Sequence, residues 1–198
     1  MVCAASRTQG TCDLDCRDVE SLRRALDAGS SAEFLFFWGH TPKGSAIGKH
    51  VLSQWWPAVF SVENQVYCSA EHYMMARKAK LFGDDETLAA IVSSGTPAEA
   101  KALGRQVRGF DERVWRDHRF QIAVRGNTAK FSQNPELKEW LIGTDSLVLV
   151  EASPVDRVWG IGLAADDSRA LDLRTWRGLN LLGFALMEVR TVLAPRRR

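Results

Sequence analysis

Residues 69–82 read Ser-Ala-Glu-His-Tyr-Met-Met-Ala-Arg-Lys-Ala-Lys-Leu-Phe, and this stretch predicts a helix that ends at Gly83. Glu71 lies in the expected first turn, and Lys78 lies two turns later on the same face. A carboxylate in the first turn stabilises a helix through its dipole by a few tenths to about 1 kcal/mol. Because the helix directly follows an expected hairpin, Glu71 could instead protrude into a cleft. The residues alone leave both roles open.

The segments around this helix predict short strands. Residues 58–69 have the pattern of a β-hairpin whose turn lies at Glu63 and Asn64. Residues 34–38 (Phe-Leu-Phe-Phe-Trp) and 146–153 (Ser-Leu-Val-Leu-Val-Glu-Ala-Ser) are apolar runs of the length expected for buried strands.

Further helices are indicated by capping residues, by proline at the first helical position and by glycine at the end. Their expected ranges are 17–28, 84–95, 96 to either 104 or 109, 111–131, 134–143 and 180–193. The strands do not alternate regularly with these helices, which argues against a doubly wound parallel sheet. We therefore expect an α+β fold, a single helix-rich domain with a small sheet of short strands.

Length and composition limit the domain organisation and the class of protein. The 198 residues fit one domain with a sizeable core, which we expect at 17–193, after a disordered leader at 1–16 and before a basic tail at 194–198. A net charge of +2 gives no reason to expect a surface that coats duplex nucleic acid. Since no apolar run could cross a bilayer or serve as a secretory signal, we expect a cytoplasmic protein without a membrane partner. The sequence does not indicate an oligomeric state.

The cysteines and histidines do not form a recognisable metal site. No second cysteine pair or histidine cluster completes a tetrahedral set around Cys12 and Cys16. No glycine-rich segment matches a phosphate-binding or dinucleotide-binding loop either. We expect neither a metal nor another cofactor.

Several polar and aromatic residues could build a ligand site, although each also has a purely structural interpretation. Asp156 follows a buried strand, where loops often carry functional groups, but aspartate also makes turns. Trp115 and Arg119 lie one helical turn apart. They could stack on a heterocycle and hold a phosphate, or they could be a core tryptophan with an arginine at its edge. Trp159 precedes Gly160, where the backbone could approach a ligand closely.

An ordered set of motifs resembles the NADAR family, also called YbiA-like proteins. The motifs are Leu-Ser-Gln-Trp at 52–55, Ala-Glu-His-Tyr at 70–73, a helix with Trp115, Lys-Phe-Ser-Gln at 130–133, Leu-Val-Glu at 149–151, Asp-Arg-Val-Trp-Gly at 156–160 and a final helix from Asn180 through Arg190. The order of these pieces over residues 34–193 is more specific than any one of them. In two places the chain departs from the family: Gln54 and Trp55 replace Asn and Phe, and Ile161 stands where members acting in riboflavin synthesis often carry an acidic residue.

The resemblance implies an N-glycosidase, a hydrolase that cleaves the bond between ribose and a nitrogen heterocycle. It implies two kinds of substrate: ADP-ribose on guanine, in nucleic acid or as a small molecule, and the phosphoribosylamino-pyrimidine intermediates of riboflavin biosynthesis. The two departures disfavour the riboflavin intermediates more than they disfavour the reaction. The alternative is a non-catalytic module that binds ADP-ribose or a related nucleotide, which would not need a carboxylate near the anomeric carbon.

The resemblance also implies roles for individual residues. Glu71, the closest match to the family's essential glutamate, would stabilise the positive charge that develops on the sugar and would hold the attacking water, with Asp156 as the second carboxylate. The remaining contacts are expected from Trp115 and Trp159 at the heterocycle, from Lys78, Arg119 and Lys130 at phosphates, and from Ser53, Gln54 and Asn180 at hydroxyl groups.

Overall fold

The computed structural model describes residues 16–42, 44 and 46–195. The helices of this part are α1 (Val19–Asp27), α2 (Ala70–Leu81), α3 (Asp85–Ser93), α4 (Pro97–Gly104), α5 (Glu112–Ser132), α6 (Pro135–Ile142) and α7 (Leu181–Leu193), with 3-10 helices at Lys49–Leu52, Ser168–Leu171 and Leu173–Thr175. The strands are β1 (Phe34–Phe37), β2 (Phe60–Val62), β3 (Gln65–Tyr67) and β4 (Val148–Glu151).

The ends of the chain test the expected domain boundaries only in part. Residues 1–15 of the expected leader and 196–198 of the expected tail lie outside the described residues. Cys16, which we assigned to the leader, is buried against the core. The boundaries themselves stay a prediction.

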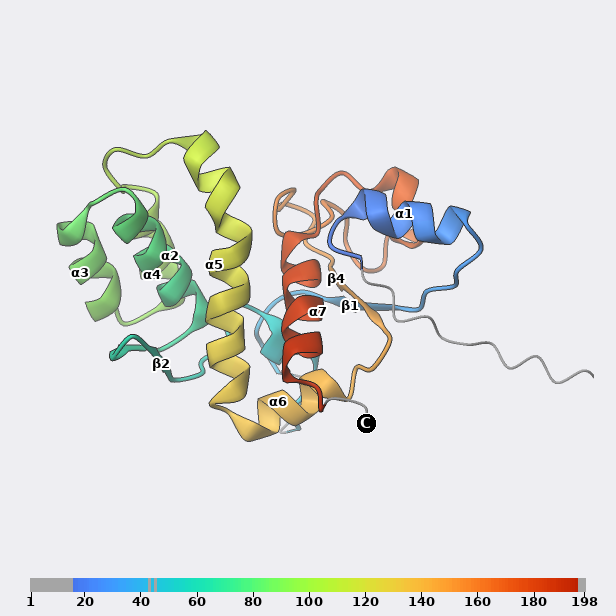
Figure 1. The fold of residues 1–198 in the computed structure, drawn as a ribbon, viewed down its shortest axis with the longest axis horizontal. Coiled ribbons are helices and arrows are strands. Elements are labelled where there is room, and N and C mark those ends of the chain that lie inside the picture. Colours follow the sequence, from blue (N-terminus) through green and yellow to red (C-terminus); the bar gives the residue numbers. More distant parts are fainter. Residues whose placement is uncertain (1–15, 43, 45, 196–198) are drawn as a thin grey trace, which may run out of the picture.

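The long helix α5 divides the molecule into two halves (Figure 1). On one side lie α2, α3, α4 and the hairpin of β2 and β3, and on the other lie α7, α1 and the pair β1 and β4. Each half has its own hydrophobic core, and α5 contributes to both: Ala123 and Phe131 belong to the core around β4 and α7, and Trp115 to the core around α2. We call these the β4 core and the α2 core.

The strands form two separate two-stranded ladders among the described residues, where we expected one small sheet. β1 pairs with β4 in parallel, with Phe34 opposite Val148 and Phe37 opposite Glu151. β2 and β3 form the expected antiparallel hairpin. The ladders stay apart because α5 stands between them (Figure 1). The α+β class is confirmed.

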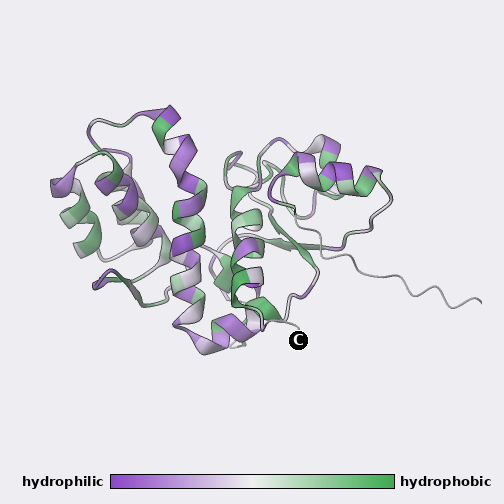
Figure 2. Cartoon of the chain, in the orientation of Figure 1, coloured by the Kyte–Doolittle hydropathy of each residue, from purple (hydrophilic) through white to green (hydrophobic). Residues whose placement is uncertain are grey.

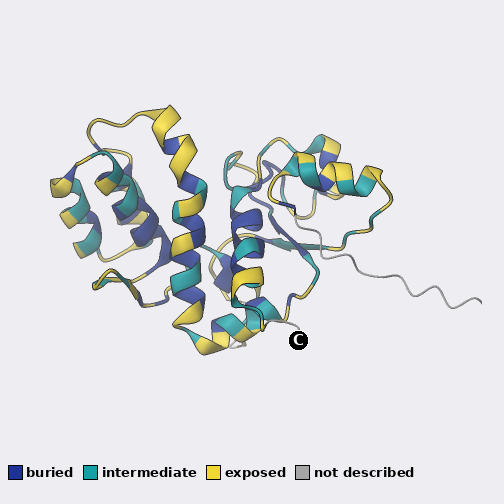
Figure 3. Cartoon of the chain, viewed as in Figure 1, coloured by how far each residue is buried: buried dark blue, intermediate teal, exposed yellow. Residues whose placement is uncertain are grey.

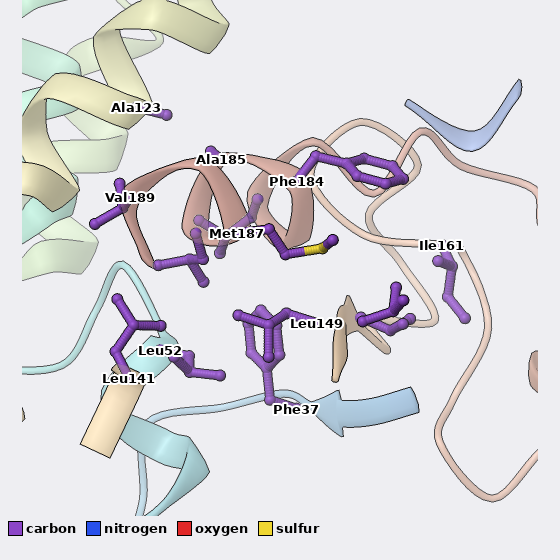
Figure 4. Packing of buried hydrophobic residues seen from close by; sticks show 14 of the residues in the cluster. Phe37, Leu52, Ala123, Leu141, Leu149, Ile161, Phe184, Ala185, Met187 and Val189 are labelled. Carbon is purple, nitrogen blue, oxygen red and sulfur yellow. The ribbon is translucent and has the colours of Figure 1, made fainter. Parts of the chain in front are cut away.

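Helix α7 covers the β1–β4 ladder with apolar side chains (Figure 4). Met187 lies on the side of α7 that faces the strand residues Phe37 and Leu149, and Ala185 lies on the opposite side, toward Ala123 of α5; all of them are buried. Figures 2 and 3 show α7 as the most apolar and one of the most deeply buried helices, whereas α1 is polar and exposed over much of its surface. This packing fixes the end of β4 against the start of α7.

Two glycines let helices approach α2 closely. A Cβ on Gly126 of α5 would lie 2.4 Å from Cδ1 of Tyr73, and a Cβ on Gly104 of α4 would lie 2.2 Å from Sδ of Met75. Gly126 lies in the middle of a 21-residue helix, where glycine is otherwise unfavourable. The backbones of α4 and α5 can therefore lie directly on the two sides of α2.

Candidate active site

Glu71 is the second residue of α2, and its side chain takes no part in starting the helix. Ser69 is the N-cap, and its hydroxyl accepts from the backbone N–H of His72. The backbone N–H of Glu71 donates to the carbonyl of Gln54 at 2.9 Å. The Glu71 side chain is only 2% exposed, and its Oε1 has no hydrogen-bond partner within the described residues. A buried carboxylate oxygen without a partner is unusual in a purely structural role.

The surroundings of Glu71 favour its protonated form. Burial, with a smaller contribution from the negative charge of Asp156, raises the pKa of Glu71 from 4.5 to about 7. Lys101, the Trp55 side chain and Arg105 act in the opposite direction. The carboxyl group can therefore exchange a proton near neutral pH, as a catalytic acid or base must.

Glu151, the last residue of β4, is a second carboxylate of interest, half-buried as a whole and not selected from the sequence. Its Oε2 is buried and lacks a hydrogen-bond partner in the described chain. Burial raises its pKa to about 8, with smaller upward contributions from Asp156 and Glu71 and a downward one from Lys101. Glu151 therefore shares its surroundings with Glu71. The available signal was a charged residue that ends an otherwise apolar strand.

Asp156 forms the turn after β4, as its structural interpretation predicted. Its Oδ1 accepts from the backbone N–H groups of Val158 and Trp159, each at 2.8 Å, and its own N–H donates to Oγ of Ser153. The same carboxylate is nevertheless near enough to raise the pKa of both glutamates. Asp156 thus adds a third negative charge near Glu71 and Glu151.

Asn180 does not have free polar groups for a ribose hydroxyl, which corrects our expectation. Its Oδ1 accepts from the N–H of Glu151 at 2.9 Å, and its Nδ2 donates to the carbonyl of Leu149 at 2.9 Å. The residue is fully buried and adopts a left-handed backbone (φ 51°) at the start of α7. Both ends of its amide hold β4, so Asn180 positions Glu151.

Lys130 is also used inside the protein, which corrects its expected contact with a phosphate. Its Nζ donates to the carbonyls of Val51 at 2.7 Å and Ser53 at 2.9 Å, and the side chain is fully buried. Burial lowers its pKa to about 7. Lys130 therefore anchors the loop that leads to Gln54.

Gln54 and Ser53 likewise support the loop beside Glu71. Gln54 Nε2 donates to Oδ1 of Asn127 on α5 at 3.0 Å, while its carbonyl receives the N–H of Glu71. Ser53 Oγ accepts from the N–H of Trp55 at 3.1 Å. Gln54 is buried, so it positions Glu71 in place of the expected contact with a hydroxyl group. Ser53 stays half-buried, and its expected contact remains a prediction.

Trp115 and Arg119 lie on one face of α5, as expected, and both are largely buried. Nη1 of Arg119 lies 3.5 Å from Oε1 of Glu112, and its Nε has no hydrogen-bond partner in the part of the chain that is described. Burial lowers the pKa of Arg119, and Asp156 opposes this shift. Arg119 on α5 is therefore near enough to Asp156 to be influenced by its charge.

Two further aromatic residues stand at this place. Trp159 is half-buried and packs against both the β4 core and the α2 core. Trp55, which the sequence analysis did not select, is half-buried, with the His40 ring 5.6 Å away and Lys101 Nζ 5.7 Å from its ring centroid. Two loops therefore bring tryptophans close to the carboxylates: Trp55 lies beside Glu71, and Trp159 follows Asp156 in the turn after β4.

Lys78 lies between α2 and α4. Its Nζ donates to the carbonyl of Gly104 at 2.8 Å and lies 4.1 Å from the ring centroid of Phe110. This contact ties the last turn of α4 to α2, and the expected contact with a phosphate stays a prediction.

Glu71 of α2 and Glu151 of β4 are near enough for Glu71 to influence the pKa of Glu151, and Asp156 raises the pKa of both. Carboxyl groups in such surroundings can transfer protons to and from a ligand. The neighbouring tryptophans and the buried Arg119 could contact a flat, polar ligand at the same site.

A NADAR domain profile matches residues 36–194. The chain belongs to the NADAR family. It is 42% identical over 163 residues to N-glycosidase R617 of Acanthamoeba polyphaga mimivirus, which covers 80% of this chain and 95% of that protein. It is 30% identical over 139 residues to N-glycosidase YbiA of Escherichia coli, which covers 70% of this chain and 77% of the relative. The NMR structure of Escherichia coli YbiA matches with a TM-score of 0.66 at 25% identity, over 81% of this chain and 84% of that one.

These NADAR relatives confirm two expectations, the YbiA-like α+β fold and an enzyme that hydrolyses N-glycosyl compounds. They do not favour a non-catalytic binding module. In the described ranges no helix is both long and apolar enough to cross a membrane, and no three potential metal ligands lie together.

Proposed function

We propose that this NADAR protein hydrolyses the bond between C1 of a ribose and a ring or exocyclic nitrogen of a heterocycle, with Glu71 and Glu151 as its acid–base pair. The observation that supports this most is that each of the two glutamates has one buried carboxylate oxygen without a hydrogen-bond partner among the described residues. Such groups cost stability, and a reaction that needs them explains why they are kept.

The two glutamates would divide the proton transfers. Burial raises the pKa of Glu71 while Lys101, Trp55 and Arg105 favour its ionised form, so Glu71 would stabilise the cationic sugar and accept a proton from the attacking water. Burial, Asp156 and Glu71 all favour the protonated form of Glu151, which would carry the proton that the leaving nitrogen needs. The C1–N bond breaks with its electron pair on nitrogen, the water oxygen bonds to C1, and solvent returns the protons.

The remaining residues would bind and orient the substrate. Trp159 and Trp115 are the candidates for stacking on the heterocycle, worth about 1–3 kcal/mol per stacked base in comparable sites. Arg119, with an unpartnered buried Nε, is a candidate for a phosphate or a ribose hydroxyl. Asp156 would hold the turn that carries Trp159.

Two substrates fit this chemistry: ADP-ribose on guanine and a phosphoribosylamino-pyrimidine. A relative in Zea mays is named riboflavin biosynthesis protein PYRR, and it is 36% identical over 132 residues, which cover 62% of this chain and 19% of that protein. Buried, apolar Ile161 in the turn after Trp159 supports the guanine compound, because riboflavin-type members often have an acidic residue there.

The test is release of free base from both substrates, measured by liquid chromatography with purified protein. We expect release from ADP-ribosylated guanosine, and more slowly or not at all from the phosphoribosylamino-pyrimidine. Release of neither base, with both compounds bound, would replace the proposed hydrolase by a nucleotide-binding module.

A further inference from the structure

Helix α4 lies along the face of α2 that carries Glu71. Met75 packs where Gly104 leaves space for it, and the Nζ of Lys78 donates to the carbonyl of Gly104. Glu71, Met75 and Lys78 lie on one face of α2, because they follow one another at helical spacing. The last turn of α4 therefore packs on the face of α2 that also carries Glu71. The side chains of that last turn of α4 are therefore neighbours of the proposed site.

Lys101 and Arg105 project from this turn, one helical turn apart. Lys101 is half-buried, acts on the charges of both Glu71 and Glu151, and lies over the ring of Trp55. Arg105 is exposed and acts on Glu71. Neither side chain makes an ion pair within 4 Å or a hydrogen bond to another described residue.

We propose that Lys101 and Arg105 form an anion subsite that binds the phosphate of the ribosyl substrate, so that the enzyme selects ribose phosphates over bare nucleosides. This inference rests on the proposed function, because the subsite takes its place from the catalytic carboxylates.

Charge is the main argument for the subsite. A phosphorylated substrate must approach Glu71, Glu151 and Asp156, all negative when ionised, so cations must stand between them and the phosphate. Lys101 is the cation that influences both glutamates. The helix dipole stabilises cations at a C-terminus, which explains why Lys101 and Arg105 at the end of α4 are positively charged residues. It does not explain why Lys101 is half-buried beside two carboxylates without pairing with either.

The other expected phosphate ligands are less free. Lys130 donates to two carbonyls inside the protein, and Lys78 donates to the carbonyl of Gly104. Arg119 is buried with Nη1 near Glu112. Arginine and lysine together would give a phosphate both a forked donor and a point charge.

The test compares each phosphorylated substrate with its dephosphorylated nucleoside in wild type, Lys101→Ala, Arg105→Ala and the double variant. Each single substitution should lower kcat/KM at least ~10-fold for the phosphorylated substrate, the scale of a charge-assisted hydrogen bond, and less than about 3-fold for the nucleoside. Arg24→Ala, which removes one exposed cation from α1 on the far side of α5, is the control and should change neither (Figure 1). Equal losses on both substrates, or no loss, would overturn the subsite.

Direct binding keeps this test separate from the proposed reaction. Calorimetry should show that ADP-ribose and ribose 5-phosphate bind wild type at least ~10-fold more tightly than the double variant. If wild type releases no base but this difference is found, the subsite stands and the hydrolase fails. Equal affinities for wild type and the double variant would overturn the subsite whatever the activity.

Discussion

Among single residues, Glu71 and Glu151 are the two on which the proposed reaction depends. Each has a buried oxygen without a described partner, and burial is the main cause of each raised pKa. Sequence spacing selected Glu71 and Asp156 but not Glu151, because whether a charged residue at a strand end is buried depends on contacts far along the chain. For the same reason Lys130 and Asn180 were expected to contact substrate, although their polar groups are used on backbone carbonyls and on β4.

Glu151→Gln should lower kcat by about 100-fold, the scale of one positioned acid. In wild type, kcat/KM should rise as pH increases through about 7, where Glu71 ionises, and fall through about 8, where Glu151 loses its proton. The variant should lose the fall at high pH, because glutamine does not titrate. Rate measurements from pH 5 to 10 check this. If kcat/KM of Glu151→Gln still falls at high pH, the fall in wild type comes from another titrating group.

At the scale of elements, helix boundaries follow local signals, and most could be predicted. Thr96 and Glu99 form the expected capping box of α4, and Asp84 and Asp111 cap α3 and α5. The hairpin turn lies at Glu63 and Asn64 as expected, and both residues have the positive φ angles of a tight hairpin turn. The separation of the two ladders could not be predicted, because it depends on where α5 packs in the folded chain.

Gly126→Ala tests the close approach of α2 and α5. The new methyl group would meet the Tyr73 ring, so we expect a loss of about 1–3 kcal/mol in the free energy of unfolding, measured in urea. Gly95→Ala is the matched control, because its Cβ would meet only ordinary contact at 3.5 Å. A variant at Gly126 as stable as wild type would mean that the two helices can move apart freely.

Asn180→Ala tests whether the start of α7 positions Glu151. The substitution removes both hydrogen bonds to β4, so kcat should fall more than KM rises, and the alkaline limb of the pH profile should shift. Asn180→Gly, which removes the same side chain but suits the positive φ, should recover stability without recovering kcat. An unchanged pH profile in stable protein would make Asn180 a structural residue only.

The whole molecule places its acid–base groups where two cores meet. Glu71 comes from the α2 core and Glu151 from the end of β4, while Trp159 packs against both cores. Helix α5 holds these halves together and adds Arg119 to the same place. The helices and strands, and through the ordered motifs the family, could be predicted from the sequence. The meeting of the two carboxylates is a property of the folded chain.

Stability should therefore depend on pH through the glutamate pair. A carboxyl group whose pKa is higher in the folded than in the unfolded state stabilises the fold at low pH. That contribution is lost as pH rises from about 4.5 to about 7 for Glu71 and about 8 for Glu151. The double variant Glu71→Gln/Glu151→Gln should thus gain thermal stability over wild type at pH 8.5 and little at pH 4.5. A gain that is the same at both pH values would contradict the raised pKa values.

The most direct measurement is turnover of Glu71→Gln by chromatography of the released base, beside wild type and the exposed control Glu86→Gln. We expect a loss of at least ~100-fold for Glu71→Gln in protein that melts no earlier than wild type, and unchanged turnover for the control. Turnover within a few-fold of wild type in folded Glu71→Gln would remove this carboxylate from the reaction.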